Sequence, residues 1–284
     1  MVGTHAVASV ARALALSTDS EAKIDIVALG PLTNVAGLVS MMPELIPRIG
    51  KVYFVAGRTP GERFHIGTAN IDTLADMNFE KDAAAAAVVL RSGVHVVLVP
   101  FRLTTHVQLR SDDLDRLQPS ESTGLIGPRL ELLRGWLAEV SRPWLQFWRT
   151  TWDVDFFIPF DTLAVVAATN PSLLRCERRT VSIIRGPSDK VMMEVANRHE
   201  GAGPAVHGHG VATKLFLVVA TTATAGETGD PPPGEDATEV EDGGMAVHAL
   251  PVTYCFEAHE ATKAFILDRI LAPPDAADPP KEEL

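Results

Sequence analysis

Residues 27–36 read Val-Ala-Leu-Gly-Pro-Leu-Thr-Asn-Val-Ala, and this run decides the expected fold of the chain. The apolar residues before Gly30 have the pattern of a buried strand, and the Gly-Pro pair ends that strand. Proline is tolerated in the first turn of a helix, where the polar side chains of Thr33 and Asn34 can satisfy backbone groups. The run therefore predicts a strand that passes directly into a helix, as in α/β proteins.

The same alternation of strands and helices continues on both sides of this run. Residues 81–91 include five consecutive alanines, which favour a helix, and 94–99 form a β-branched run typical of a strand covered on both faces. This alternation predicts a mostly parallel sheet with flanking helices, and ligands in such sheets bind at the carboxyl ends of the strands. The predicted helices are 5–16, 32–41 and 81–91, and the predicted strands are 24–29, 52–56 and 94–99.

The second half of the chain has a different pattern. An amphipathic stretch over 124–148 predicts one or two helices, and a further helix begins at Asp161. Residues 224–244 are rich in Gly, Pro and acids and predict a disordered insertion, and 272–284 predict a frayed tail. We therefore expect a single domain over residues 1–271. The remaining predictions are strands at 180–184, 191–195 and 214–220, which form a small antiparallel element, a strand at 252–255 and a helix at 258–271.

The formal net charge of −11 comes almost entirely from two segments. Residues 224–243 contribute −7 and the tail from Ala272 contributes −3, so the rest of the chain is nearly neutral. Without a basic stripe, nucleic acid is not an expected partner. No apolar stretch approaches the ~20 residues that cross a bilayer, and the first residues do not resemble a signal peptide, so we expect a cytoplasmic protein without a membrane partner.

The two cysteines, Cys176 and Cys255, do not have the spacing of a metal or redox motif. We expect them to be buried free thiols.

Three polar positions lie close together in the sequence at Asn70, Asp76 and Asn78. Amide and carboxylate groups are what a ribose requires, because each hydroxyl can both donate and accept a hydrogen bond. The alternative interpretation is a polar loop in which Asp82 or Asn78 caps the following helix. An aspartate that opens a helix, as Asp161 does, is likewise usually a cap.

The run at 27–36, together with Asp76-Met77-Asn78 and Pro159-Phe160-Asp161, resembles the inosine/uridine-preferring nucleoside hydrolases. The resemblance implies the nucleoside hydrolase fold and a ribonucleoside N-glycosidase that releases ribose and a free base. It also implies calcium as cofactor, with the backbone carbonyl of Leu29 and the carboxylate of Asp161 as ligands. By the same resemblance Asn70, Asp76 and Asn78 bind the sugar, although the family usually has Glu where Asp76 stands and Gly-Asn where this chain has Ala69-Asn70.

Phe160 departs from the family pattern. The family often has histidine here, which helps to protonate the leaving base, and a phenyl ring cannot donate a proton. Phe160 does offer a face on which a base can stack. The sequence therefore favours purine nucleosides over uridine.

The family's aspartate cluster, of the form D-x-D-x-G-x-D-D, does not occur in these 284 residues. In the family roughly a further hundred residues come first and carry this cluster, which supplies the general base and most calcium ligands. We therefore expect an N-terminally truncated form of the fold, no catalytic residue among the site residues, an incomplete calcium site and impaired activity. The pairs Asp112-Asp113 and Asp153-Val154-Asp155 lack the glycine-containing spacing and are interpreted as helix caps or loop charges.

Two alternatives remain open from the sequence. The chain is either a ribonucleoside N-glycosidase whose activity is impaired, as a truncated gene model or a degenerate family member, or a catalytically inactive protein that binds nucleosides or serves as an oligomer partner. Homo-oligomerisation fits both. A third, weaker hypothesis is another α/β hydrolase that uses Asp153, Asp155 or Asp161 without calcium.

Overall fold

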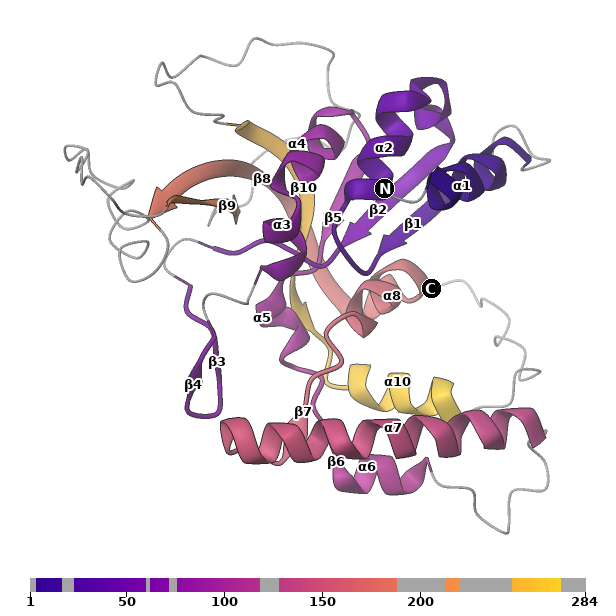
Figure 1. Cartoon of the computed structure of the whole chain (residues 1–284), viewed down its shortest axis with the longest axis vertical. Helices are drawn as coiled ribbons and strands as arrows, with labels where there is room; N and C mark the ends of the chain where they lie inside the picture. The colour runs from indigo at the N-terminus through magenta and orange to yellow at the C-terminus, as the bar shows by residue number, and fades with distance from the viewer. Residues whose placement is uncertain are drawn as a thin grey trace.

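A six-stranded sheet forms the centre of the molecule (Figure 1). The computed structural model describes residues 4–16, 23–59, 62–71, 76–117, 128–187, 213–219 and 247–271. The strand order is β1-β2-β5-β10-β8-β9. The first four strands in this order are parallel to one another, and β8 and β9 are antiparallel to their neighbours. The strands are β1 (Ile24–Ala28), β2 (Ile49–Phe54), β5 (His95–Leu98), β10 (Val247–Ala258), β8 (Leu174–Pro187) and β9 (Thr213–Val219).

The predicted parallel α/β sheet is confirmed, and so are the antiparallel strands that follow it. These later strands extend the main sheet, because β10 lies between β5 and β8. The predicted strand at 191–195, the acidic insertion at 224–244 and the tail at 272–284 lie outside the described residues.

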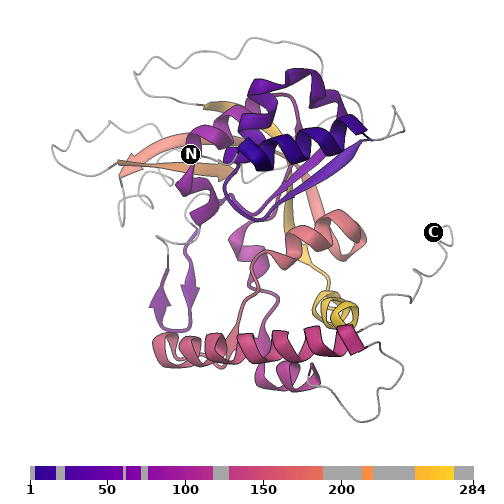
Figure 2. The ribbon, with the colours of Figure 1, turned by 45° about the vertical axis from the view of Figure 1, so that its right-hand side comes forward.

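One face of the sheet is covered by α1 (Thr4–Leu16), α2 (Thr33–Met41) and α4 (Ala83–Arg91), as Figure 2 shows. These helices bury the even-numbered strand residues Phe54 and Leu98. Successive side chains of a strand point to opposite faces, so the odd-numbered residues of the same strands are available to the other layer.

The opposite face is covered by α8 (Thr162–Thr169) and α10 (Thr262–Leu271). Tyr53 and Val97 pack there with buried residues of both helices. The short helix α5 (Phe101–Thr104) follows β5 and contributes Leu103 to the same cluster.

A second layer of structure lies beyond the carboxyl ends of the strands. It contains the long helix α7 (Pro128–Trp152), which is one continuous helix that includes Pro143. A hydrophobic cluster around the fully buried Trp148 joins it to its neighbours. These neighbours are α6 (Ser111–Arg116), the hairpin β3 (His65–Ile66) and β4 (Ala69–Asn70), and the strand pair β6 (Leu109–Arg110) and β7 (Phe156–Phe157).

The remaining described elements are short. They are α3 (Met77–Lys81) and the 3₁₀ helices η1 (Pro43–Arg48) and η2 (Pro171–Leu173). No helix in the described part of the chain is long and apolar enough to cross a membrane.

The prediction of two free thiols is wrong in this structure. Cys176 of β8 and Cys255 of β10 form a disulfide, and they are direct partners in the antiparallel register of these strands. Cys176 is exposed, whereas Cys255 is buried. Their 79-residue separation concealed this proximity, because the sequence does not specify the register between distant strands.

Candidate functional site

The carboxyl ends of β1 and β2 and the beginning of α8 lie at the same edge of the sheet. Leu29 directly follows β1 and is 49% exposed. Leu163 and Ala164 of the first turn of α8 are buried in one cluster with Val55, which follows β2. Asp161 immediately precedes this turn, so the structure brings it to the strand ends where Leu29 lies.

Asp76 and Asn78 are both anchored to the loop after β2. The carboxylate of Asp76 is buried, and its Oδ1 atom accepts a hydrogen bond of 3.1 Å from the amide of Gly57. The side-chain amide of Asn78 donates to the carbonyl of Val55 at 3.2 Å. These bonds hold the start of α3 against the end of β2, and they bring these two predicted sugar-binding residues together.

The helix-capping role belongs to Asp82 and not to Asn78. Asp82 Oδ1 accepts a hydrogen bond of 3.0 Å from the amide of Ala85 in the first turn of α4. Its other oxygen accepts a bond of 2.6 Å from the hydroxyl of Thr33, at the start of α2. Thr33, in the run at 27–36, therefore links the start of α2 to the start of α4 through Asp82.

Asp161 precedes α8 but its side chain makes no capping hydrogen bond. The carboxyl group is about half-buried, and this burial raises its pKa above the ordinary value of 3.8. Carboxyl groups with perturbed pKa values cluster at functional sites, which makes Asp161 a candidate for one. The expectation that such an aspartate is usually a cap is wrong here.

Phe160 lies next to Asp161 and is partly buried among aromatic rings. Its ring stacks on Phe101 with centroids 5.1 Å apart and lies 6.0 Å from the ring of Trp148. The structure therefore places an aromatic wall beside Asp161, built from α5, α7 and the turn before α8.

Asn70 lies on the hairpin formed by β3 and β4. It is exposed on β4, where it pairs with His65 of β3. The hairpin extends from the sheet towards α7 (Figures 1 and 2).

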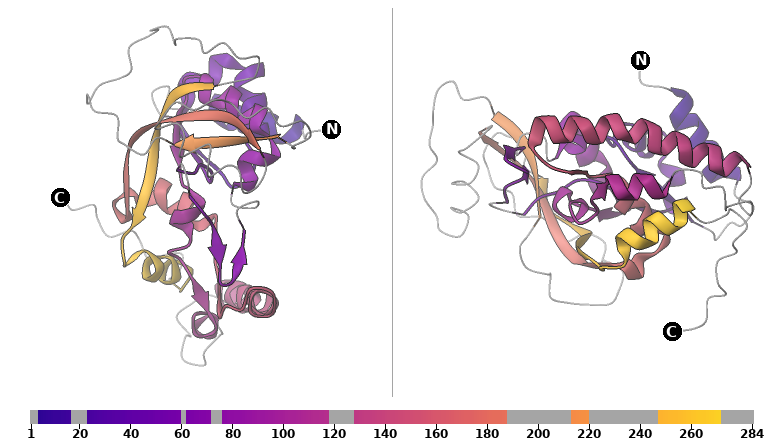
Figure 3. Two further views of the ribbon diagram at one scale, coloured as in Figure 1. Left: turned by 90° about the vertical axis from the view of Figure 1, so that its left-hand side faces the viewer. Right: turned by 90° about the horizontal axis from the view of Figure 1, so that it is seen from below.

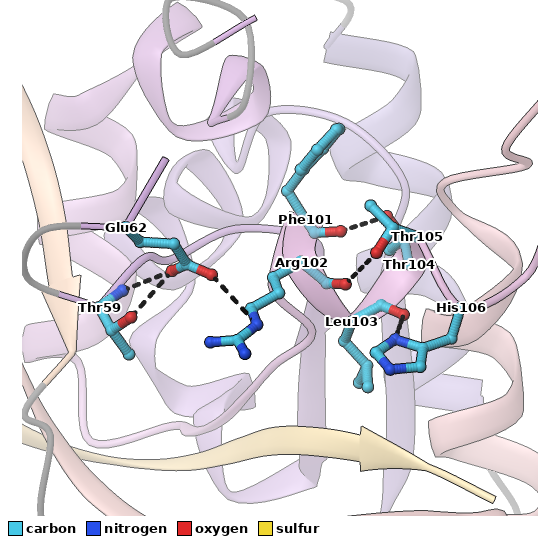
Figure 4. Close-up of polar contacts among 8 residues, drawn as sticks. All are labelled: Thr59, Glu62, Phe101, Arg102, Leu103, Thr104, Thr105 and His106. Atoms are coloured by element: carbon cyan, nitrogen blue, oxygen red, sulfur yellow. Dashed lines mark hydrogen bonds and ion pairs between the residues drawn. The ribbon is translucent and has the colours of Figure 1, made fainter. Parts of the chain in front are cut away.

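An acidic side chain that the sequence did not single out is held between the strand ends and α5. Glu62 accepts hydrogen bonds from the amide and the hydroxyl of Thr59, at 2.8 and 3.0 Å, and lies 3.9 Å from Nε of Arg102 (Figure 4). Only 5% of the Glu62 side chain is exposed. The same view shows Thr104 and Thr105 donating to the carbonyls of Phe101 and Arg102, which satisfies backbone acceptors of this short helix.

Tyr254 is a second residue that the sequence did not indicate. It is buried on β10, opposite Leu98 of β5. Burial raises the pKa of its hydroxyl, and the negative charges of Glu62 and Asp76 add to this effect, whereas Arg179 and Arg102 oppose it. Tyr254 lies within the predicted strand at 252–255, and an aromatic residue there is the ordinary pattern of a core position. The sequence therefore did not indicate a role for it in the site.

The alternative acidic pairs have structural roles. Asp113 accepts a hydrogen bond of 2.8 Å from the amide of Arg110 and forms an ion pair of 2.7 Å with Lys263. Asp155 is paired with the guanidinium of Arg110. Both observations agree with their interpretation as a helix cap and a loop charge.

The residues that the structure describes do not by themselves form a complete calcium site. Calcium takes roughly six to eight oxygen ligands, and the family resemblance implies only two here, the carbonyl of Leu29 and the carboxylate of Asp161. The seven described stretches contain no group of three or more His, Cys, Asp or Glu side chains that could hold a metal ion. A complete calcium site would need further oxygen ligands besides these two.

Comparison with known families identifies the chain. The family model for the inosine-uridine preferring nucleoside hydrolases matches residues 2–223. The chain belongs to this family. The nucleoside hydrolase resemblance noted from the motifs is thereby confirmed.

This chain is similar to several curated ribonucleoside hydrolases over part of their length. A probable ribonucleoside hydrolase from Dictyostelium discoideum is 30% identical over 162 residues, which are 57% of this chain and 44% of that protein. The non-specific ribonucleoside hydrolase RihC of Escherichia coli K12 is 35% identical over 101 residues, 36% of this chain and 31% of that protein. The chain thus spans less than half of these relatives.

Solved structures of nucleoside hydrolases share the fold. The plant nucleoside hydrolase PpNRh1 has a TM-score of 0.57 and 21% identity, and the match covers 88% of this chain and 62% of that one. The inosine-uridine preferring nucleoside hydrolase of Bacillus anthracis has a TM-score of 0.53 and 17% identity, with 93% and 64% covered.

Proposed function

We propose that the protein is a ribonucleoside N-glycosidase and that these 284 residues form the part of its site that binds the sugar and the base. The observation that carries this proposal is the grouping of Asp76, Asn78 and Asp161 at the carboxyl ends of the strands, with Phe160 beside them. Membership of the nucleoside hydrolase family supports the same reaction.

The reaction would be hydrolysis of the N-glycosidic bond at the anomeric carbon of ribose. The oxygen of a water forms a bond to this carbon while the bond to the base nitrogen breaks, and a proton reaches the departing base. Asn78 would present its carbonyl oxygen to a ribose hydroxyl, since its amide group is already held by Val55. Phe160 would stack on the base, which favours purines because they offer the larger ring surface.

A general base and calcium are the parts of the reaction that these residues do not supply. We propose that Leu29 and Asp161 contribute to calcium binding only together with further oxygen ligands. An inactive nucleoside-binding protein is the second candidate, and it is favoured by the engagement of Asp113 and Asp155 in structural contacts.

Nucleoside binding can be tested by NMR titration of the 284-residue chain with inosine and with free ribose. We expect inosine to bind with a dissociation constant of about 1 mM and more tightly than ribose. Phe160→Ala should weaken inosine binding about three- to tenfold, and Asn78→Ala about fivefold. Phe265→Ala and Asn170→Ala are matched controls on α10 and at the far end of α8. Equal affinities for inosine and ribose, or no effect of either site variant, would contradict the proposed site.

Hydrolysis can be tested separately by measuring ribose release from inosine with and without calcium. The isolated chain should remain at background, because loss of a general base alone costs about 10²–10⁴-fold in rate. Calcium-dependent release that Asp161→Ala abolishes would show that the described residues suffice after all. Binding without hydrolysis, in a chain extended by any additional native sequence, would favour the inactive alternative.

A further inference from the structure

The carboxylate of Glu62 is buried beside the candidate site, yet one of its two oxygens has no hydrogen-bond donor among the described residues. Only 5% of the side chain is exposed. Oε2 accepts two hydrogen bonds from Thr59, at 2.8 Å from the amide and 3.0 Å from the hydroxyl. Oε1 is buried as well, and it is this atom that lacks a donor within the described stretches. A buried acceptor of this kind costs free energy until a donor reaches it.

Oε1 is paired with the guanidinium of Arg102 on α5, at a distance too long for a hydrogen bond. The Nε atom of Arg102 lies 3.9 Å from Oε1, whereas N–H···O hydrogen bonds measure about 2.7–3.2 Å. Figure 4 shows the two groups facing each other across this gap, with Thr59 on the other side of the carboxylate. The side chain of Arg102 is 72% exposed, so it can move without disturbing the core.

The gap between Glu62 and Arg102 has the chemistry and the size that a hydroxyl group requires. A hydroxyl can donate to a carboxylate and accept from a guanidinium N–H at the same time. An oxygen about 2.7 Å from Oε1 and about 2.9 Å from Nε spans their separation of 3.9 Å with an angle of about 90° between the two bonds. An ammonium group cannot accept from Arg102, and a fully ionised phosphate cannot donate to Glu62. The pair is therefore selective for a neutral hydroxyl.

This pair links the two elements that carry the proposed sugar and base contacts. The loop that contains Thr59 also donates a backbone amide to the carboxylate of Asp76 at 3.1 Å. Arg102 directly follows Phe101, whose ring stacks on Phe160 with centroids 5.1 Å apart. The pair therefore lies between the loop that holds Asp76 and the helix that supports the aromatic wall.

The charges of the pair act in the same region as the carboxylate of Asp76. Burial raises the pKa of the Tyr254 hydroxyl, and the charges of Glu62 and Asp76 raise it further, whereas Arg179 and Arg102 lower it. Charged groups that act on one phenol lie close to one another. The hairpin β3–β4 follows Glu62 in the chain and descends from the sheet to α7 (Figure 3, left), so Glu62 lies at the sheet end of this hairpin.

We propose that Glu62 and Arg102 together bind one hydroxyl of the sugar and are specificity-determining residues of the site. Oε1 of Glu62 accepts a hydrogen bond from this hydroxyl, and Nε of Arg102 donates one to its oxygen. Because Thr59 already fixes the carboxylate, little conformational entropy is lost when the hydroxyl binds. The inference rests on the proposed nucleoside binding and adds two residues that the sequence motifs do not contain.

A thermodynamic cycle between protein variants and deoxynucleosides tests this contact. NMR titration gives the dissociation constants of the wild type, Glu62→Ala and Arg102→Met for inosine and for its 2′-, 3′- and 5′-deoxy analogues. Glu62→Ala should weaken inosine binding about tenfold, because a hydrogen bond to a charged acceptor is lost, and Arg102→Met about threefold. One of the three analogues lacks the bound hydroxyl, and for this analogue both variants should bind as tightly as the wild type.

The result with the deoxy analogues separates a direct contact from a structural role. If Glu62 only stabilised the loop after β2, Glu62→Ala would weaken the binding of all four ligands by the same factor. Glu44→Ala is the matched control, because it makes the same change in η1, before β2, and should leave all four affinities unchanged.

A more conservative variant, Glu62→Gln, keeps the test informative if Glu62→Ala lowers stability. Its carbonyl oxygen can still accept from Thr59, and its amide nitrogen then stands where Oε1 was, so a charged acceptor is replaced by a neutral donor. Inosine binding should weaken about threefold, and again not for the analogue that Glu62→Ala leaves unaffected.

The outcomes also distinguish this inference from the proposed function. Inosine that binds no more tightly than free ribose would contradict the nucleoside site itself. Specific inosine binding that Glu62→Ala and Glu62→Gln leave unchanged, or a loss of equal size for all three deoxy analogues, would overturn the hydroxyl contact alone.

Discussion

Asp161 shows most directly how a single residue of this site differs from its ordinary structural role. A carboxylate before a helix normally lowers the energy of the helix terminus by accepting its amide protons. Asp161 makes no such bond and is partly desolvated. Burial of the charged carboxylate without such a bond works against the folded state at neutral pH.

Replacement of Asp161 by asparagine should increase stability in a pH-dependent manner. The pKa of Asp161 is raised in the folded state, so the folded protein binds its proton more tightly than the unfolded chain does. The free energy of unfolding of the wild type should consequently fall as the pH rises from about 3.8 through the folded-state pKa. Asp161→Asn removes this fall.

Urea unfolding of both proteins at a series of pH values measures the effect. The stability difference in favour of Asp161→Asn should be constant below pH 3.8 and grow above it to a plateau at neutral pH. A variant that is less stable than the wild type at pH 7 would show that Asp161 stabilises the fold.

At the scale of elements, the hairpin β3–β4 depends on one glycine at its turn. Gly67 has a positive φ of 55°, a conformation that costs side-chain-bearing residues energy. A Cβ atom at this position would lie 2.1 Å from the backbone oxygen of Trp152 and 2.6 Å from Val154. The hairpin thus rests directly on the end of α7.

Gly67→Ala should destabilise the protein by about 2 kcal/mol, because the backbone of Trp152 cannot move aside as a flexible side chain would. Gly30→Ala is the matched control, since a Cβ atom there meets nothing within 4 Å and the expected change is close to zero. Urea unfolding gives both values, and hydrogen exchange should show faster opening of the hairpin only in Gly67→Ala. Equal effects of the two substitutions would indicate that the hairpin does not rest on α7.

The elements near the opening run were predictable because their signals are local. The strand at 24–29, the helix at 32–41 and the helix at 161–168 agree with β1, α2 and α8 to within a few residues. Each is defined by apolar periodicity and by Gly, Pro or Asp at its end.

The candidate site was predictable only in part. The anchoring of Asp76 to Gly57 and of Asn78 to Val55 joins segments about twenty residues apart, and no local pattern specifies it. Tyr254 reaches the same region only because β10 is inserted beside β5. Long-range pairing of strands decides these contacts, so the sequence alone could not supply them.

At the scale of the whole molecule, the disulfide joins the parallel and antiparallel parts of the sheet by linking β10 to β8. It closes a loop of 79 residues in the unfolded chain. A loop of this length restricts the unfolded state considerably.

Cys176→Ser should therefore lower the free energy of unfolding by about 2–4 kcal/mol. Cys176 is the suitable position because it is exposed, whereas a substitution at the buried Cys255 would also disturb the core. Urea unfolding gives the free energy of unfolding of the oxidised wild type, the reduced wild type and the variant. The reduced wild type and the variant should have the same value. Two alkylatable thiols in the wild type purified without reductant would contradict the pairing.

The central position of β10 also sets an order of events during synthesis. Ribosomes deliver the chain from its N-terminus, so β5 and β8 emerge long before the strand that must lie between them. Until residues 247–258 are made, both of these strands have an unpaired edge on the side that β10 will occupy. Until β10 has been made these edges are open to pairing with other chains, and the six-stranded sheet can close only after residues 247–258 are present.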